Sequence, residues 1–337
     1  MYFFSILAAL GQMFILAHSA LSAPVVSRPP QGLGEGPALA ADFPDPSIIK
    51  VDDKWYAFAT ASGNKQVQVA RADKLYGNWE LLDVDALPVS PSWATGKNTW
   101  APDVRLVGNG TFVMYFSGQS AVNKAHHCVG AATSPTILGP YTPVDTPFAC
   151  DLTVGGAIDP SGFRDADGKQ YVAYKIDGNS IGNGGSCGNT VAPIMKTPIM
   201  LQEVAQEDGV TKIGAPVQIL DRIAEDGPLV EAPSIMRTAA GLYVMTFSSG
   251  CFTAPTYDLD YATADSVKGP YTRAKSPVAK TKKFGLTSPG GATVLSYGDV
   301  NDEQPSIAFH ANCKQGRCLY TSEIDFDDSD MTISLVM

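Results

Sequence analysis

The stretch ADFPDPSIIKVDDKWYAFAT, residues 41–60, contains the pattern that decides the fold. A proline-containing start leads into a short apolar segment, a polar turn follows at Asp52 and Asp53, and an aromatic-rich segment ends the stretch. Residues of high strand propensity between turn residues predict two β-strands joined by a tight turn. No long stretch of the chain has a 3.6-residue periodicity with helix caps, so the expected class is all-β.

Four further copies of this pattern follow along the chain. Each leads through a polar turn into a second strand, and several contain a later echo, such as LYGNWELL (75–82), that predicts a turn into an outer strand. Each repeat therefore offers about four strands, which is the content of one propeller blade. The four copies start at TWAPDV (99–104), AIDPSGFRD (157–165), VEAPSI (230–235) and SPGGA (288–292).

We therefore predict an all-β, five-bladed β-propeller with four-stranded blades around a central active-site funnel. The alternative, a generic β-sandwich, does not explain five ordered repeats. Because blades pack face to face, both faces of each sheet should bury apolar side chains, and the strands accordingly read as nearly continuous hydrophobic runs. The final segment IDFDDSDMTISLVM (324–337) is the candidate for a strand that returns to close the ring.

The chain divides into three segments. Residues 1–23 form an apolar stretch of low charge with small residues at its end. This predicts a secretory signal peptide, with an uncleaved N-terminal anchor as the alternative. Residues 24–40 are expected to be an N-terminal extension and residues 41–337 the propeller, which is the catalytic domain. The protein is therefore expected to be secreted and extracellular.

The chain of 337 residues has a formal net charge of −10. An acidic surface repels nucleic-acid phosphates and anionic lipids, so neither nucleic acid nor a membrane is an expected partner. A neutral substrate is compatible with this charge, and we expect a monomer.

Cysteines and one sequon add further expectations for a secreted chain. All 6 cysteines follow the predicted signal peptide, and an even count predicts three disulfides. Their short sequence separations favour the pairs Cys128–Cys150 and Cys313–Cys318. The sequon Asn109-Gly110-Thr111 lies at a predicted turn, so Asn109 is the expected glycosylation site.

Three of the five repeat starts carry a carboxylate one or two residues before a proline. The innermost strand of each propeller blade lines the central channel, so acids that are far apart in sequence are expected to meet there. Converging like charges oppose ionisation, and cleavage of a glycosidic bond needs one protonated and one ionised carboxyl group. Turn chemistry explains each site alone, but three acids at equivalent repeat positions favour catalysis. The three acids are Asp45, Asp159 and Glu231.

The motifs ADFPDPSII (41–49), TWAPDV, AIDPSGFRD and VEAPSI together resemble glycoside hydrolase family 43, within the arabinanase-like five-bladed propellers, over nearly the whole mature chain. The resemblance implies that Asp45 is the general base, Glu231 the general acid and Asp159 the pKa modulator and orienter of the acid. It also implies inversion of the anomeric configuration, which needs about 6.5–9.5 Å between acid and base to admit water.

The same resemblance bears on metal binding. Many members of this family hold a calcium or another ion on the propeller axis, often through a histidine in a Gly-His motif that opens the fifth blade. This chain has SPGGA (288–292) there, with no histidine. His310, in AFHA, matches a second histidine position and is the candidate ligand of an axial Ca²⁺, with a hydrogen-bonded core histidine as the alternative. No cofactor is otherwise required.

The resemblance also suggests pocket residues and a substrate. Trp100 and Phe43 are expected beside the pocket, where a ring can stack on a sugar, with core packing as the alternative for both. The implied partner is an arabinose- or xylose-containing polysaccharide or oligosaccharide of the plant cell wall. The chain leaves no room for the C-terminal β-sandwich of the family's xylosidases, which favours an α-L-arabinofuranosidase or another arabinan-degrading activity.

Other functions compete with this one. A β-xylosidase or an endo-arabinanase of the same family is expected to use the same three acids. The fructan- and sucrose-cleaving propellers use an Asn-Asp-Pro-like start and a Glu-Cys motif, whereas this chain has Phe-Pro-Asp-Pro and Glu-Ala-Pro. A non-catalytic carbohydrate-binding propeller would most simply lack one of the acids, and all three are present.

Overall fold

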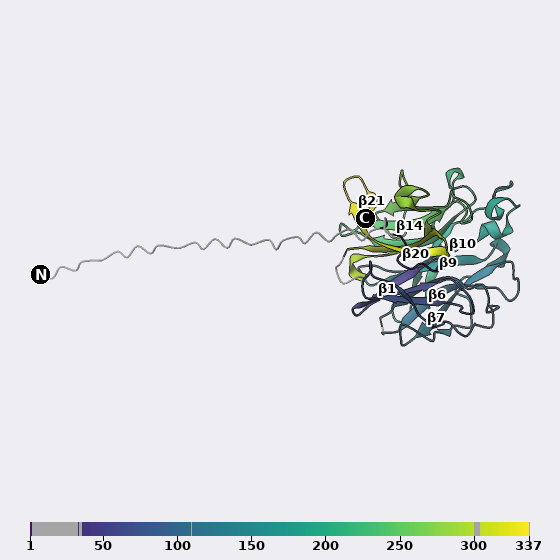
Figure 1. Ribbon diagram of the computed structural model, residues 1–337, viewed down its shortest axis with the longest axis horizontal. Coiled ribbons are helices and arrows are strands. Elements are labelled where there is room, and N and C mark those ends of the chain that lie inside the picture. Colours follow the sequence, from purple (N-terminus) through teal and green to yellow (C-terminus); the bar gives the residue numbers. More distant parts are fainter. Residues whose placement is uncertain (2–32, 34–35, 109, 300–303, 337) are drawn as a thin grey trace. The chain divides into compact units, whose positions relative to one another are not determined.

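The computed structural model describes residues 1, 33, 36–108, 110–299 and 304–336. It separates into a unit of residues 1–30 and a unit of residues 31–337, and the second unit holds every strand named below. Figure 1 draws the other residues as a thin grey trace. The predicted signal peptide, apart from Met1, and the expected glycosylation site Asn109 lie outside the described residues.

Among the described residues, five antiparallel sheets follow one another along the chain, one for each repeat (Figure 1). Blade one contains β1 (Ser47–Val51), β2 (Lys54–Ala59), β3 (Gln68–Ala72) and β4 (Glu80–Leu81). Blade two contains β5 (Trp100–Leu106), β6 (Phe112–Gln119), β7 (His127–Ser134) and β8 (Thr142–Pro143). Blade three contains β9 (Ala157–Arg164), β10 (Gln170–Ile176), β11 (Ile199–Val204) and β12 (Lys212–Leu220).

The last two blades follow the same order. Blade four contains β13 (Val230–Arg237), β14 (Tyr243–Ser249), β15 (Asp258–Ala264), β16 (Thr272–Arg273) and β17 (Ala279–Lys280). Blade five contains β18 (Gly290–Leu295), β19 (Ser306–Cys313), β20 (Gly316–Asp327) and β21 (Thr332–Leu335). Short 3-10 helices lie in the connections: η2 (Leu152–Val154), η3 (Gly178–Ile181), η4 (Ser186–Gly188), η5 (Ala224–Asp226), η6 (Lys283–Gly285) and η7 (Tyr297–Asp299).

The prediction of a five-bladed propeller with four-stranded blades is confirmed, with one addition. In each blade the strands are hydrogen-bonded in chain order, and in blade four β17 also pairs with β15 as a fifth strand. The first strand of each blade contacts the first strands of both neighbouring blades, so β1, β5, β9, β13 and β18 form a ring around the axis. The starts of these five strands therefore converge.

The core of the propeller lies between neighbouring blades, and each of five hydrophobic clusters joins two adjacent blades. Strand β6 shows how this works, because successive side chains of a strand point to opposite faces. Phe112, Met114 and Phe116 pack towards blade one, whereas Val113 and Tyr115 pack towards blade three. An apolar residue at every position therefore serves two cores, as the continuous hydrophobic runs predict.

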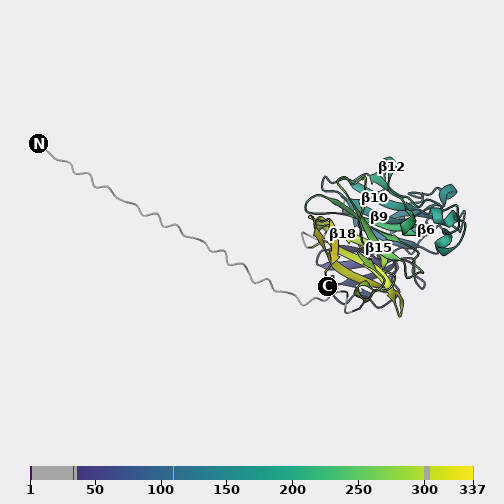
Figure 2. The same cartoon turned by 90° about the horizontal axis from the view of Figure 1, so that it is seen from above.

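The first and last blades are joined through the N-terminal side of the propeller. Leu39 N–H donates to Leu319 O (3.3 Å) and Phe43 N–H donates to Arg317 O (2.8 Å), and both acceptors lie on β20. In Figures 1 and 2 the purple first blade accordingly lies beside the yellow last blade. Strand β21 pairs with β20 as the outer strand of its own blade. The expectation that the C-terminal segment closes the ring is therefore wrong.

Three disulfides join the cysteines of the described chain. The pairs Cys128–Cys150 and Cys313–Cys318 confirm the two that short sequence separations favoured. The third, Cys187–Cys251, joins the long connection between β10 and β11 to blade four. This connection, which contains η3 and η4, makes the third repeat longer than the others.

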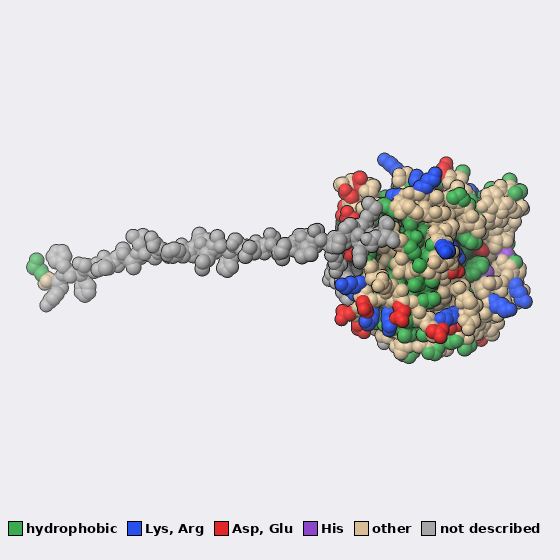
Figure 3. All heavy atoms as spheres, viewed as in Figure 1, with side chains coloured by type: hydrophobic (Ala, Val, Ile, Leu, Met, Phe, Trp, Pro, Cys, Tyr) green, Lys and Arg blue, Asp and Glu red, His purple; other side chains and the backbone are tan. Residues whose placement is uncertain are grey.

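Charged side chains on the face drawn in Figure 3 are interspersed, with Asp and Glu next to Lys and Arg along its rim. Such a mixture of signs is typical of a surface in contact with water. In the part of the chain that the structure describes, no helix has the length and apolar character needed to cross a membrane.

Candidate active site

The first strand of every blade begins at one residue with a left-handed backbone, with φ between 43° and 59° at all five. In four blades this residue directly precedes a proline. A left-handed backbone costs a non-glycine residue roughly 1–2 kcal/mol, and such strain clusters at functional sites. The five residues are Asp45, Ala101, Asp159, Ala232 and Gly291, and all of them line one small axial cavity.

Asp45 and Asp159 are therefore structurally equivalent, as the repeat predicts, but Glu231 is not. In blade four the left-handed position belongs to Ala232, and Glu231 lies one residue earlier in β13. Trp100 holds this earlier position in blade two, because Trp100 and Glu231 pair with corresponding residues of the second strand. The interpretation of three acids at equivalent positions is thus wrong for Glu231. Aligning the repeats on their prolines would have shown it.

A second ring of five side chains lies at the second strands, and four of them accept hydrogen bonds from the left-handed residues. We call it the acceptor belt, and its members are Thr60, Ser117, Lys175, Ser248 and His310. Each acceptor comes from the blade that precedes the donor. Four bonds follow this rule: Ala101 N to Thr60 Oγ1 (2.9 Å), Asp159 N to Ser117 Oγ (2.9 Å), Gly291 N to Ser248 Oγ (2.9 Å) and Asp45 N to His310 Nδ1 (3.1 Å).

The carboxylate of Asp45 is surrounded by donors. Thr60 Oγ1 donates to Oδ2 (2.7 Å), and the Arg317 guanidinium lies 3.3 Å from Oδ1. Burial alone raises the pKa of Asp45, but the charge of Arg317 and the hydrogen bonds outweigh it and hold this pKa well below its usual range. Burial lowers the pKa of His310, so its ring is neutral near pH 7. Asp45 is therefore an ionised carboxylate that is available to accept a proton.

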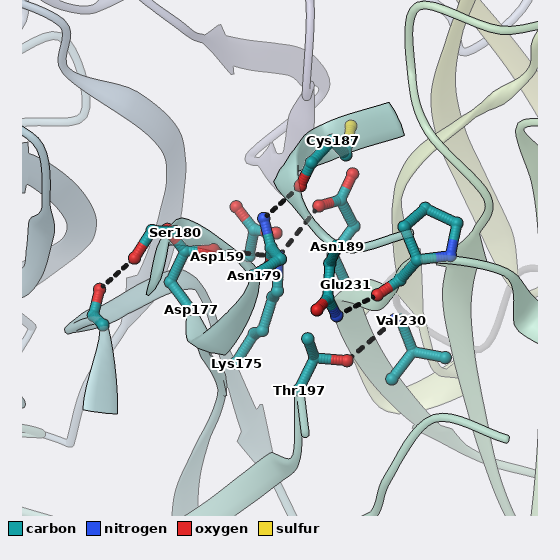
Figure 4. A network of polar contacts seen from close by, with 12 residues as sticks. Asp159, Lys175, Asp177, Asn179, Ser180, Cys187, Asn189, Thr197, Val230 and Glu231 are labelled. Atoms are coloured by element: carbon teal, nitrogen blue, oxygen red, sulfur yellow. Dashed lines mark hydrogen bonds and ion pairs between the residues drawn. The ribbon is translucent and has the colours of Figure 1, made fainter. Parts of the chain in front are cut away.

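The carboxylate of Glu231 is held from two sides, and Figure 4 shows the side of Lys175. The hydroxyl of Tyr257 donates to Oε1 (2.8 Å), and Lys175 Nζ lies 3.2 Å from Oε2. The side chain of Glu231 keeps 13% of its surface exposed, whereas Lys175 is fully buried. Glu231 is thus fixed in direction while one part of it still meets solvent, as a group that exchanges protons with a substrate requires.

Asp159 lies beside Glu231, and its Oδ2 accepts a hydrogen bond from Ala232 N–H (3.0 Å). Burial, and after it the charge of Glu231, raise the pKa of Asp159 well above its usual range, and Lys175 only partly opposes this. The carboxyl group of Asp159 therefore keeps its proton to higher pH than a free aspartic acid does. The site thus combines an ionised carboxylate, Asp45, with a carboxyl group that holds a proton, Asp159, next to Glu231.

A short path of contacts links Glu231 and Asp159, the acid half of the site, to Asp45 on the other side of the axis. Tyr257 donates to Glu231, and its ring stacks on that of His310 with the centroids 5.9 Å apart. His310 Nδ1 in turn lies 3.3 Å from Asp45 Oδ1. The structure thus brings Asp45, Asp159 and Glu231 to one centre on the axis. The first strands of blades one, three and four begin there.

Sequence reasoning missed four residues of this centre: Thr60, Lys175, Tyr257 and Arg317. Lys175 carried a signal, because it is a charged residue directly after the run YVAY (171–174) of strand β10. The other three reach the acids from other strands or blades, and no local motif marks them.

The two predicted pocket aromatics differ in position. Trp100 is half-buried and stacks on His127 with 3.5 Å between ring centroids. Phe43 is fully buried in the core between blades one and five, so its ring is core packing and not a pocket wall, which corrects the expectation. Phe252, which the sequence did not single out, is 43% exposed and lies 5.1 Å from the guanidinium of Arg317. It is thus an exposed ring near Asp45.

The residues around His310 do not fit an axial calcium ion. Nδ1 of His310 lies against Asp45, whose N–H it accepts, and Nε2 is buried with no hydrogen-bond partner among the described residues. Ca²⁺ takes oxygen ligands, so one imidazole nitrogen does not make a calcium site. The described residues also contain no group of three or more His, Cys, Asp or Glu side chains placed to hold a metal. No step is therefore assigned to an ion.

The sequence of this chain is similar to those of known proteins. Residues 35–331 match the family described as Glycosyl hydrolases family 43. The extracellular endo-alpha-(1->5)-L-arabinanase of Thermotoga petrophila is 30% identical over 39% of this chain and 33% of that protein. The extracellular endo-alpha-(1->5)-L-arabinanase 1 of Bacillus subtilis is 25% identical over 76% of this chain and 72% of that protein. The xylan 1,3-beta-xylosidase of Vibrio sp is 25% identical over 70% of this chain and 42% of that protein.

The chain therefore spans less than half the length of the Thermotoga and Vibrio relatives. Among solved structures, a thermostable family-43 glycoside hydrolase has a TM-score of 0.73 at 24% identity, over 88% of this chain and 94% of that one. The endo-arabinase of Bacteroides thetaiotaomicron VPI-5482 has a TM-score of 0.68 at 19% identity, over 87% and 97%. At these identities the likeness shows the fold.

Proposed function

This chain belongs to glycosyl hydrolases family 43, an inverting family of glycoside hydrolases, and from this premise we propose that it is a secreted arabinan-degrading enzyme, most specifically an α-L-arabinofuranosidase. The observation that carries the proposal is the contrast within one site between the ionised Asp45 and Asp159, whose pKa is raised by burial and by the charge of the adjacent Glu231. Glycosidic cleavage with inversion needs one carboxyl group of each kind.

In this proposal Asp45 is the general base and Glu231 the general acid. Asp45 takes a proton from a water molecule, whose oxygen attacks the anomeric carbon. The bond from that carbon to the glycosidic oxygen breaks, and Glu231 gives its proton to the leaving oxygen. Arg317 and Thr60 keep Asp45 ionised, and Tyr257 directs the carboxyl of Glu231. Solvent then returns the site to its starting protonation.

Asp159 is proposed to hold and orient the acid. It is buried beside Glu231, and burial together with the charge of Glu231 raises the pKa of Asp159, so that Asp159 keeps a proton next to the acid. The proton is then available to Glu231 when a glycosidic oxygen approaches. Trp100 and Phe252 are the proposed sugar contacts, since both have exposed ring surface. Members of the family need no cofactor in general.

The substrate class and the compartment are supported by the relatives and the disulfides. Two of the relatives named above are extracellular arabinanases by name, and the third is a xylosidase. Three disulfides suit an oxidising compartment. We therefore propose an extracellular, monomeric enzyme with a glycan at Asn109, acting on arabinose- or xylose-containing polysaccharides. A β-xylosidase is the second candidate, favoured by the Vibrio relative.

The test is a substrate screen of the purified protein and of the variant Glu231→Gln. Arabinan, arabinoxylan, xylo-oligosaccharides, 4-nitrophenyl α-L-arabinofuranoside and 4-nitrophenyl β-D-xyloside are each assayed. We expect turnover of the arabinose-containing substrates, a loss of about 10²–10⁴-fold in Glu231→Gln, and an inverted product by NMR. The matched control is Glu80→Gln, because Glu80 is 67% exposed on the outer strand β4, where it pairs with Arg71.

Two outcomes contradict the proposal in different ways. Turnover of xylosides alone assigns the chain to the β-xylosidases. If the protein binds these glycans but cleaves none, the chain is a non-catalytic carbohydrate-binding propeller.

A further inference from the structure

One member of the acceptor belt departs from the pattern, and it does so next to the proposed acid. Thr60, Ser117, Ser248 and His310 each accept an N–H from the next blade. Lys175 holds the fifth position, and an ammonium group has three donors and no acceptor. Lys175 therefore does not receive the N–H of the next blade.

The N–H of Ala232 in blade four, which Lys175 cannot accept, has a different acceptor. Ala232 N–H donates to Asp159 Oδ2 (3.0 Å), so the carboxylate of Asp159 does the work that a serine does in blades two and four. A serine at position 175 would place an acceptor there as in those blades. The belt itself thus gives no reason for a lysine.

Lys175 instead bridges two carboxylates. Its Nζ lies 3.1 Å from Asp177 Oδ1 and 3.2 Å from Glu231 Oε2, and its side chain has 0% of its surface exposed. Figure 4 shows Lys175 between these two acids. Burying a cation is unfavourable unless it is paired, and here both partners are themselves nearly buried.

We propose that Lys175 is a positioning residue for the proposed general acid: it fixes the carboxyl group of Glu231 and stabilises the carboxylate that Glu231 becomes when it gives up its proton. The inference rests on the proposed function and deepens it. Asp177 anchors Lys175 from the other side, and its own N–H donates to Gly156 O (3.0 Å), which ties the pair to blade three. The lysine thus belongs to the acid half of the site.

The charged and titratable groups around this pair come from all five blades. Lys175 forms an ion pair with Glu231, and Arg317 forms one with Asp45. The groups that face Glu231 or Lys175 directly, or act on one of their neighbours, are Asp45, His127, Asp159, Asp177, Tyr257, His310 and Arg317.

The main variant is Lys175→Ser, which removes the cation and supplies the acceptor that the belt uses elsewhere. We expect it to fold, to lower kcat/KM at the optimum about tenfold or more, and to move the alkaline limb of the pH profile to higher pH by about 1–3 units. The limb moves up because the anion formed on proton donation has lost its counter-charge. Lys175→Arg, which keeps the charge, should retain most of the original limb.

Two further variants separate charge from packing. Ser117→Ala removes a belt acceptor without changing any charge, so it should lower the melting temperature and move the alkaline limb less than Lys175→Ser does. Asp177→Asn removes the competing anion from Lys175 and should move the alkaline limb to lower pH, opposite to Lys175→Ser. The proposal is overturned if Lys175→Ser loses stability but keeps its alkaline limb. It is also overturned if the alkaline limb moves in the same direction in Lys175→Ser and in Asp177→Asn.

A readout without substrate keeps this inference separate from the proposed function. Carboxyl ¹³C NMR of the unliganded protein follows the protonation of Asp159 and Glu231 directly. Lys175→Ser should shift that titration to higher pH whether or not any glycan is cleaved. If the wild-type protein cleaves no glycan while the titration shifts, the proposed function fails and the electrostatic role of Lys175 stands. An unchanged titration in an active enzyme refutes the role of Lys175 alone.

Discussion

Asp45 and Asp159 occupy the same place in two blades, yet the protein treats their carboxyl groups in opposite ways. Both precede a proline, both have a left-handed backbone with φ of 53° and 55°, and both donate their N–H to the acceptor belt. The pKa of Asp45 is lowered despite its burial, whereas burial and Glu231 raise the pKa of Asp159. Position in the repeat brings an acid to the axis, and the adjoining blades decide its chemistry.

The difference arises from what each neighbouring blade contributes. Asp45 receives a hydroxyl donor from its own blade and a guanidinium from blade five. Asp159 receives a second carboxylate, that of Glu231, from blade four, and the charge of Lys175 acts on both. Two carboxyl groups whose environments push their pKa values apart are the usual basis for separate acid and base roles.

Replacing Asp45 tests the ionised side of this comparison and should have the largest effect. Asp45→Asn keeps the shape and the N–H bond to His310 but cannot accept a proton from water. We expect kcat/KM to fall by about 10²–10⁴-fold, measured on the substrate found in the screen. Added azide, a nucleophile that needs no base, should restore turnover and yield a glycosyl azide.

Asp73→Asn is the matched control for this change, because the side chain of Asp73 is 80% exposed at the surface. Near-normal activity of Asp45→Asn would remove Asp45 from the role of base and with it the contrast between the two aspartates.

Replacing Asp159 tests the proton-holding side and should have an intermediate effect. Asp159→Asn removes the carboxyl group beside Glu231. The repulsion between two carboxylates, which favours the protonated acid, is then lost. We expect kcat/KM to fall about 10²-fold and the alkaline limb of its pH profile to move to lower pH. An alkaline limb that stays in place, measured over pH 4–9 in ~0.5-unit steps, would show that Asp159 does not act on the acid.

Replacing Arg317 sharpens the comparison and should have the smallest effect at the optimum. After burial, which raises the pKa of Asp45, Arg317 is the largest influence on it and lowers it. In Arg317→Met that pKa therefore rises. Because the base must be ionised, the acidic limb of kcat/KM should move to higher pH by about 1–3 units.

Arg317→Lys is the control for this prediction, because it keeps the charge and so most of the original limb. If Arg317→Met leaves the acidic limb unmoved while raising KM, the guanidinium acts on the substrate and not on Asp45.

The architecture was readable from the sequence because the repeat is marked by residues with fixed backbone roles. Prolines at residues 46, 102, 160 and 233 mark the start of the first strand in four blades. Continuous apolar runs predicted sheets buried on both faces, which the clusters between blades confirm. The closing of the ring was not readable, since hydrogen bonds such as Leu39 N–H to Leu319 O leave no pattern in either segment.

The site was readable only as far as the acids themselves. Asp45 and Asp159 follow from the Asp-Pro repeat, whereas Glu231 depends on a one-residue offset that the left-handed Ala232 creates. The partners that decide each proton affinity come from far along the chain. Arg317 and Asp45 are 272 positions apart, and Lys175 and Glu231 are 56 apart. Such pairs become visible only when the blades close into a ring.

The hydrogen bond from Asp45 N–H to His310 spans 265 positions of the chain and has a consequence for biosynthesis. A ribosome adds about 5–20 residues per second, so roughly 13–53 s separate the making of these two residues. Until β19 and β20 have emerged, a nascent chain carries Asp45 without the imidazole and guanidinium that settle its protonation. A precursor that stops short of the fifth blade therefore contains every acid of the site and none of its finished chemistry.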